Sequence, residues 1–410
     1  MKRNDEVKAR PEQRKAKLLR PADLPDNFTR SLYKIAPYRG CAHGCRYCDG
    51  RAERYYVEGD FERDLEIRRD IPDRLAAELP SLRERGMVGF GSGVTDPYQP
   101  AEFREGITGR CARILAESPR ALPALVMTKS SLVLRDLPAW RRVNERAGFV
   151  LLISLTSLDE GLRELMEPGA SSFESRLETI RAFKTAGCSV GVLAMPFLPG
   201  LSDSSESIAA LYGACAEAGV DFVMPGGLTL RPGRQKEFYL KALAAYRPAL
   251  LQRTLDIYRE ERPSGSPRAA EARALFKRID PIRRGFNMPY FLPHEIFARF
   301  LPSHDALRIL FLDMLELYAE RGADTAALKR SAALYDEWLL GLRRAFRRKR
   351  NLPETWIEER FEEASQDEEL YRVLGNERLS AFVWRVLREG ARLDYNTLKL
   401  KATSSQSWPR

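Results

Sequence analysis

Three cysteines stand close together in Gly40-Cys41-Ala42-His43-Gly44-Cys45-Arg46-Tyr47-Cys48, a C-x3-C-x2-C spacing. The chain has 410 residues and three other cysteines, which are far apart: Cys111, Cys188 and Cys215. Clustered cysteines at short spacing are the usual sequence sign of a metal site. Three thiolates are one fewer than a closed zinc site or a fully protein-ligated four-iron cluster needs. Another ligand must therefore complete the site.

Two kinds of metal site satisfy this requirement. A zinc site would recruit His43 and give three Cys and one His, which is typical of a nucleic-acid-binding module. An iron-sulfur cluster would use Cys41, Cys45 and Cys48 and leave one iron open to an exogenous ligand. A chain that carries a cluster as a scaffold without turnover is a third hypothesis.

The composition allows one large domain and a smaller one, since 44% of the residues are hydrophobic. No apolar run approaches the roughly 20 residues that a membrane span needs, and the charged stretch 1–20 lacks the apolar core of a secretory signal. We therefore expect no membrane association and a cytoplasmic location. The net charge is +10, and the excess cations lie in residues 1–39 and 231–410. These basic flanks make nucleic acid a candidate partner, although an arginine-rich helical surface would look the same.

Short apolar runs alternate with helical periodicity from residue 31 to about 250. The predicted strands cover 32–37, 87–91, 123–128, 149–155, 189–195 and 220–225. The predicted helices cover 64–79, 103–118, 131–146, 160–166, 173–186, 204–218 and 234–247. Six strand-plus-helix units in succession predict a parallel α/β sheet curled into a partial (β/α)6 TIM-type barrel.

The candidate functional residues follow these strands. The cysteine loop follows the first strand, Thr95 the second and Lys129 the third, while Ser154 ends the fourth and Met195 the fifth. Because the carboxyl ends of parallel barrel strands share one face, we expect these side chains to gather there.

Residues after about 250 show helical periodicity with almost no strand signal. We predict a basic flexible arm at 1–30, the partial barrel at 31–262, a helical C-terminal domain at 263–400 and a disordered tail at 401–410. In the helical part, the run Arg343–Arg350 stands near Trp338, Trp356 and Trp384. Cations interleaved with aromatic residues suit a nucleic-acid groove, but a solvated helix end with core tryptophans is the favoured interpretation.

The sequence resembles a known family. The C-x3-C-x2-C loop with Tyr47 before its last cysteine is similar to the signature of the radical S-adenosylmethionine (SAM) enzymes. The stretches Ala36–Cys41, Thr95–Glu102 and Thr128–Ser130 resemble the branch related to spore photoproduct lyase. The resemblance covers residues 30 to about 260. It implies a [4Fe-4S] cluster on the three cysteines, with SAM on the open iron.

The resemblance also implies a SAM pocket and a reaction. Residue by residue, the matching positions are Tyr47 near the adenine, Lys129 at the SAM carboxylate, Ser154 at the ribose or carboxylate, and Thr95, Arg176 and Met195 as further contacts. Reductive cleavage of SAM would then remove a hydrogen atom from a substrate that the sequence does not identify. An electron donor such as flavodoxin or ferredoxin is the implied partner.

Two departures from the branch concern the substrate. The donor cysteine of spore photoproduct lyase has no counterpart in Gly91–Asp96, so the lesion-splitting reaction in that form is doubtful, and Tyr98 is a speculative hydrogen donor. The second departure is Asp49-Gly50-Arg51, where related proteins more often have Tyr-Ala-Arg. It suggests an altered substrate pocket.

Overall fold

The computed structural model describes residues 17–55, 59–92 and 94–402. The first part of the predicted arm at 1–30 and most of the predicted tail at 401–410 lie outside these residues. The chain divides into two compact units. The first contains the described residues before Arg20, together with Lys34–Pro80 and Phe90–Tyr290; the second contains Arg20–Tyr33, Ser81–Gly89 and the chain from Phe291 onward.

This division differs from the one expected from sequence. We placed the domain boundary at 262/263, whereas helix α10 (Ala269–Gly285) belongs to the first unit. Residues 20–30 were expected to be a flexible arm, but they belong to the second unit, where Arg308 donates to the Pro25 carbonyl oxygen over 2.9 Å. Two residues of this segment, Thr29 and Arg30, are buried.

A six-stranded sheet organises the first unit, which confirms the predicted α/β partial barrel. The strand order is β1-β4-β5-β6-β7-β8. The strands are β1 (Tyr33–Ile35), β4 (Val88–Phe90), β5 (Ala124–Thr128), β6 (Phe149–Ser154), β7 (Ser189–Phe197) and β8 (Phe222–Gly227). From β5 to β8 the neighbours pair in parallel, as strands joined by crossover helices must.

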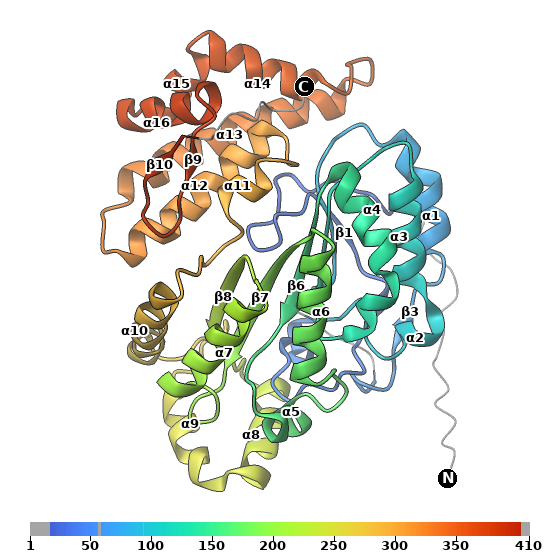
Figure 1. Ribbon diagram of the computed structural model, residues 1–410, viewed down its shortest axis with the longest axis vertical. Coiled ribbons are helices and arrows are strands. Elements are labelled where there is room, and N and C mark those ends of the chain that lie inside the picture. Colours follow the sequence, from blue (N-terminus) through green and yellow to red (C-terminus); the bar gives the residue numbers. More distant parts are fainter. Residues whose placement is uncertain (1–16, 56–58, 93, 403–410) are drawn as a thin grey trace. The chain divides into compact units, whose positions relative to one another are not determined.

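The other helices of this unit lie between the strands in the chain or follow the last strand, and several run alongside the sheet in Figure 1. They are α1 (Ile71–Glu78), α2 (Glu102–Glu105), α3 (Ile107–Glu117), α4 (Leu137–Ala147), α5 (Glu160–Met166), α6 (Phe173–Thr185), α7 (Ser205–Glu217), α8 (Arg234–Tyr246) and α9 (Leu251–Ile257). Burial of the strands is nearly continuous, since β5 and β6 have no exposed residue. Such strands read as unbroken apolar runs, which is why the sequence reveals them.

Two of the predicted helices are interrupted. The helix expected over 64–79 begins only at Ile71, because Glu66–Ile67 form strand β3, which pairs antiparallel with β2 (Tyr38–Arg39). The helix expected over 103–118 is split into α2 and α3 at Gly106, whose φ of +60° is a left-handed conformation that ends a helix.

An aromatic chain joins the sheet to the helices that cover it. The Trp140 ring of α4 stacks on Phe149 of β6 with 4.9 Å between centroids and meets the edge of Phe90 at 5.5 Å. Phe149 in turn stacks on Phe183 of α6 at 5.8 Å. All four rings are fully buried, so this chain forms the centre of the core between sheet and helices.

The second unit is mainly helical, as expected. Its helices are α11 (His294–Phe297), α12 (Ser303–Glu320), α13 (Ala326–Arg348), α14 (Trp356–Gln366), α15 (Glu369–Leu374) and α16 (Glu377–Arg388). A short antiparallel pair that sequence did not reveal, β9 (Arg392–Leu393) with β10 (Leu400–Lys401), follows them. In the described part of the chain no helix is both long and apolar enough to cross a membrane.

Two arginines of the basic run on α13, Arg343 and Arg347, form ion pairs within the second unit. Arg343 is fully buried and pairs with Asp305 of α12 at 2.7 Å and with Glu84 at 2.9 Å. Arg347 also pairs with Glu84, at 3.0 Å. Phe346 between them is buried and stacks on Trp356 with 6.3 Å between centroids. The favoured interpretation of a solvated helix end with core tryptophans therefore holds only in part, because Arg344 and Arg348–Arg350 are exposed, whereas Arg343 is buried and Trp384 is 48% exposed.

The close packing of β7 against β8 yields a stability prediction. A Cβ on Gly191 would lie 2.2 Å from Cζ of Phe222, the residue opposite it in the register. We expect Gly191→Ala to destabilise the protein by about 1–3 kcal/mol, because an overpacked core must shift. Gly341→Ala in the middle of α13, where a Cβ meets nothing within 4 Å, should instead stabilise it by about 0.5–1 kcal/mol. Urea unfolding of both variants tests this; equal effects would contradict it.

Candidate functional site

The cysteine loop follows strands β1 and β2, at the carboxyl end of the first strand of the sheet. Cys41 and Cys45 are buried, Cys48 is half-buried, and all three are free. Burial raises the pKa of each of these thiols, and for Cys41 the nearby Asp96 carboxylate adds to that effect. Buried neighbouring thiols become thiolates only when a cation compensates their charge, which is what a metal centre supplies.

The backbone at the start of the loop is fixed by side chains from the segment after β4. Gly40 has a φ of +81°, and its carbonyl oxygen accepts hydrogen bonds from Thr95 Oγ1 at 2.9 Å and Gln99 Nε2 at 3.1 Å. The amide oxygen of Gln99 accepts the Ala42 N–H at 2.8 Å. One glutamine therefore holds the backbone on both sides of Cys41.

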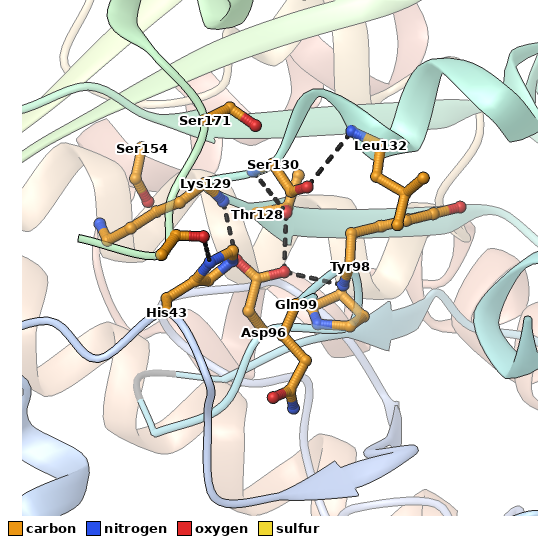
Figure 2. A network of polar contacts seen from close by, with 12 residues as sticks. His43, Asp96, Tyr98, Gln99, Thr128, Lys129, Ser130, Leu132, Ser154 and Ser171 are labelled. Carbon is orange, nitrogen blue, oxygen red and sulfur yellow. Dashed lines mark hydrogen bonds and ion pairs between the residues drawn. The ribbon is translucent and has the colours of Figure 1, made fainter. Parts of the chain in front are cut away.

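Both ring nitrogens of His43 lie beside protein oxygen atoms. Nδ1 lies 2.8 Å from the Gly169 carbonyl oxygen, and Nε2 lies 3.1 Å from Asp96 Oδ2. Asp96 also accepts from Thr128 Oγ1 and the Lys129 N–H, both at 2.7 Å, and Figure 2 shows its carboxylate between the imidazole and the end of β5. Burial alone would raise the pKa of Asp96, but His43 and these hydrogen bonds outweigh burial and lower it.

This arrangement bears on the choice between zinc and a cluster. A zinc ion bonded by three Cys and one His needs an imidazole nitrogen directed at the thiols, whereas both ring nitrogens of His43 lie beside protein oxygens. Within 17–55, 59–92 and 94–402, no three His, Cys, Asp or Glu side chains are grouped so that they could hold one metal ion. The loop offers three thiols, which fits a larger centre such as a cluster better than a single ion.

The segment between α5 and α6 covers the cysteine loop. The Arg46 N–H donates to the Met166 carbonyl oxygen, and the Gly169 N–H to the His43 carbonyl oxygen, both over 2.9 Å. A Cβ on Gly169 would stand 2.4 Å from the Ala42 carbonyl oxygen, far inside contact distance. Only glycine allows the two backbones to approach this closely.

The segment after β8 holds the far end of the loop. Gln235 Nε2 donates to the Tyr47 carbonyl oxygen and to Asp49 Oδ1, both over 3.0 Å. Asp49 also accepts from Thr229 Oγ1 at 2.9 Å and pairs with Arg231 at 3.2 Å. Within the departure Asp49-Gly50-Arg51, Asp49 therefore anchors the loop to this segment, whereas Gly50 and Arg51 line a pocket of about 380 Å³.

Three of the expected pocket residues meet around a carboxylate that sequence did not reveal. Glu167 is buried, and its oxygens contact the Tyr47 hydroxyl, Arg176 Nη2 at 2.5 Å and Lys129 Nζ at 3.6 Å. Burial alone would raise the pKa of Glu167, but Arg176, Lys129 and the Tyr47 hydrogen bond together lower it to about 2. Glu167 thus remains ionised and fixes a tyrosine and two cations beside the loop.

The strand register explains how these residues meet. Thr128 of β5 lies opposite Ile153 of β6, so Lys129 and Ser154 follow at the same level. Ser154 lies opposite Leu193 of β7, two residues before Met195. Arg176 of α6 donates over 2.9 Å to the Ser154 carbonyl oxygen.

The expected residues do not all point into this network. Arg176 is fully buried, and its nitrogens are used by Glu167 and by the carbonyl oxygens of Ser154 and Ser171, so the structure favours a positioning role for it. Thr95 holds the Gly40 carbonyl oxygen, as described above. Met195 lies beside Gly226 of β8: a Cβ added to Gly226 would be 3.0 Å from the Cβ of Met195.

Tyr98, the speculative hydrogen donor, points elsewhere. Its hydroxyl donates to Asp136 over 3.1 Å and accepts from Trp140 Nε1 at 2.7 Å, and burial raises its pKa well above the ordinary value. Figure 2 shows the phenol directed away from His43 and Lys129. This position does not suit transfer of a hydrogen atom beside the cysteine loop, so we do not retain that hypothesis.

Removal of the Glu167 charge should test the network. We expect Glu167→Gln to destabilise the protein by about 3–5 kcal/mol, because Arg176 would remain buried without its counter-ion. The control Glu164→Gln, whose carboxylate is 73% exposed and 3.4 Å from Arg163, should cost at most about 1 kcal/mol. Urea unfolding measures both; a loss for Glu167→Gln as small as the control's would show that the network does not stabilise the fold.

Comparison with known proteins agrees with the geometry. The family model described as the radical SAM superfamily matches residues 35–212. An uncharacterized protein of Mycobacterium tuberculosis is 34% identical over 233 residues, 55% of this chain and 67% of that protein. An uncharacterized protein of Methanocaldococcus jannaschii is 24% identical over 180 residues, 44% of this chain and 65% of that protein.

Among solved structures, a spore photoproduct lyase mutant superposes with a TM-score of 0.50. The match covers 69% of this chain and 86% of that chain, at 16% sequence identity. At this identity the likeness concerns the fold.

Proposed function

The chain belongs to the radical SAM superfamily, and we propose that it holds a [4Fe-4S] cluster on Cys41, Cys45 and Cys48, cleaves SAM reductively and removes a hydrogen atom from its substrate. Membership makes it an enzyme of the radical SAM type, a family that implies both the cluster and SAM. The cluster ligands, the SAM contacts and the hydrogen abstraction are our proposal.

One observation carries the proposal: the loop has three free thiols, two buried and one half-buried, and a histidine whose two ring nitrogens lie beside oxygens of Gly169 and Asp96. Such a loop supplies three protein ligands, one fewer than a four-iron cluster has irons. One iron is then available to an exogenous ligand. When bound, the cluster and SAM supply a one-electron cleavage of the sulfonium that gives methionine and a 5′-deoxyadenosyl radical.

The residues of the chain bind and orient what the cofactors act on. Lys129 has a side chain 15% exposed, and its ammonium nitrogen lies 3.6 Å from Glu167 Oε1. Its ammonium can therefore bind the SAM carboxylate while Glu167 holds the side chain in place. The Ser154 hydroxyl at the next strand end both donates and accepts, as a ribose hydroxyl requires.

Buried groups around the loop keep its position fixed. Asp96 joins His43 to the end of β5, and Glu167 joins Tyr47 to Arg176 and Lys129. A site that must keep water from a reactive radical benefits from being preorganised in this way, because no side chain has to move at the moment of reaction.

Substrate and electron donor complete the proposal. The basic flanks of the chain make nucleic acid a candidate substrate, and a flavodoxin or ferredoxin is the proposed donor. The absence of a cysteine in the described residues of Gly91–Asp96 still argues against lesion splitting as spore photoproduct lyase performs it.

Metal analysis tests the ligand set. After anaerobic reconstitution, we expect iron and sulfide at about four of each per chain and no stoichiometric zinc. Cys41→Ser should lose most of the iron, whereas His43→Gln, which keeps a side chain able to hydrogen-bond, should retain it. Zinc at one per chain that disappears in His43→Gln would overturn the proposal. Iron and sulfide without release of 5′-deoxyadenosine under reductant would favour the scaffold hypothesis.

The role of Lys129 is tested by SAM binding. Loss of a charge-assisted hydrogen bond costs about 1.5–3 kcal/mol, so Lys129→Met should weaken SAM binding by roughly tenfold or more. Lys277→Met on the exposed face of α10 removes the same charge and should leave SAM affinity unchanged. Equilibrium dialysis with reconstituted protein measures both, and equal affinities would exclude the carboxylate contact.

A further inference from the structure

A pocket of about 370 Å³ lies beside the cysteine loop in the first unit. It is bounded by the antiparallel pair β2 and β3, by the 3-10 turn Glu53–Tyr55 and by the segment that follows β4. Its lining includes Gly40, the residue directly before Cys41. A ligand in this pocket therefore contacts the base of the cysteine loop.

Positive charge distinguishes this pocket. Arg39, Arg54 and Arg68 line it, and Glu66 is the one acid among its described lining residues. Glu66 lies opposite Arg39 in the β2–β3 register, so it offsets part of this charge and leaves an excess of cations among the described lining residues. A neighbouring pocket of about 380 Å³ differs, because its cations and acids are equal in number: Arg51, Arg234 and Lys241 against Asp60, Glu62 and Glu237.

Two of these arginines, Arg68 and Arg54, make contacts with neighbouring groups that restrict their positions. The backbone N–H of Arg68 donates to the Pro37 carbonyl oxygen at 3.0 Å, and its side-chain Nη1 donates to the Ala36 carbonyl oxygen at 3.1 Å. The Arg54 guanidinium lies 5.0 Å from the centroid of the Tyr55 ring. A guanidinium held over an aromatic ring loses less freedom when it binds an anion, which favours binding.

Polar groups complete the lining on the side of the loop. Ser92 and Thr95 both border the pocket. The Thr95 hydroxyl donates to Gly40, so this wall is tied to the cysteine loop itself. A group bound against this wall is thus placed by the same contact that fixes the loop.

We propose that this pocket binds a phosphate group of the substrate. Guanidinium groups match phosphate geometry and bind it with two parallel hydrogen bonds. The volume is at the lower end of the roughly 300–1,000 Å³ typical of small-ligand sites, which suits one nucleotide-sized unit. The assignment of the ligand as substrate rests on the proposed function; the binding of phosphate rests on the pocket alone.

Calorimetry on the full reconstituted chain with saturating SAM tests the proposal. The probes are inorganic pyrophosphate, uridine 5′-monophosphate, the dinucleotide UpU and uridine. We expect the phosphate-bearing probes to bind and uridine to bind at least roughly tenfold more weakly. Arg39→Gln and Arg54→Gln should each weaken this binding by roughly tenfold, and the affinity should fall with rising salt. Arg141→Gln on α4, whose side chain is 61% exposed, is the charge-matched control and should change nothing.

The probes separate the sources of the phosphate. UpU binding as tightly as the mononucleotide would indicate a strand, and binding at least tenfold weaker would indicate a free nucleotide. No saturable binding of any phosphate-bearing probe, or equal losses in Arg54→Gln and Arg141→Gln, would overturn the proposal. Release of 5′-deoxyadenosine is measured on the same preparations: cleavage without phosphate binding contradicts only the pocket, and phosphate binding without cleavage contradicts only the proposed function.

Discussion

The close approach of the His43 imidazole to the Asp96 carboxylate is the interaction on which the site depends. It takes the imidazole away from the thiols and ties the middle of the cysteine loop to the end of β5, where Lys129 stands. A buried carboxylate is costly unless it is fully hydrogen-bonded, and Asp96 meets this condition through His43, Thr128 and the Lys129 N–H. The histidine between the three thiols thus lies beside another partner, as the proposed three-cysteine ligand set requires.

Much of this arrangement is visible in the sequence. Buried parallel strands are continuous apolar runs, and the carboxyl ends of such strands share one face of the sheet, so the positions of Lys129, Ser154 and Met195 follow from the pattern. The cysteine spacing indicates a metal centre by itself. The resemblance then proposes which polar residues surround it.

The sequence does not reveal the residues that hold the site together. Glu167 is one of many acids in helical segments, and its importance depends on Arg176 and Tyr47, which come from two other elements. Gln99 and Gly169 act through backbone contacts that periodicity does not encode. The boundary of the second unit was also hidden, since Arg20–Tyr33 and Ser81–Gly89 join residues far along the chain through pairs such as Glu84 with Arg343.

The contacts of the cysteine loop with Gly169 and Gln235 have a consequence for synthesis. A chain made from its N-terminus exposes Cys41, Cys45 and Cys48 long before the residues that cover them have left the ribosome. During this interval the thiols are open to solvent and to oxidants. The segment after β8 can cover the loop only once it has been translated. The order of synthesis therefore leaves the thiols exposed for a time before the fold is complete.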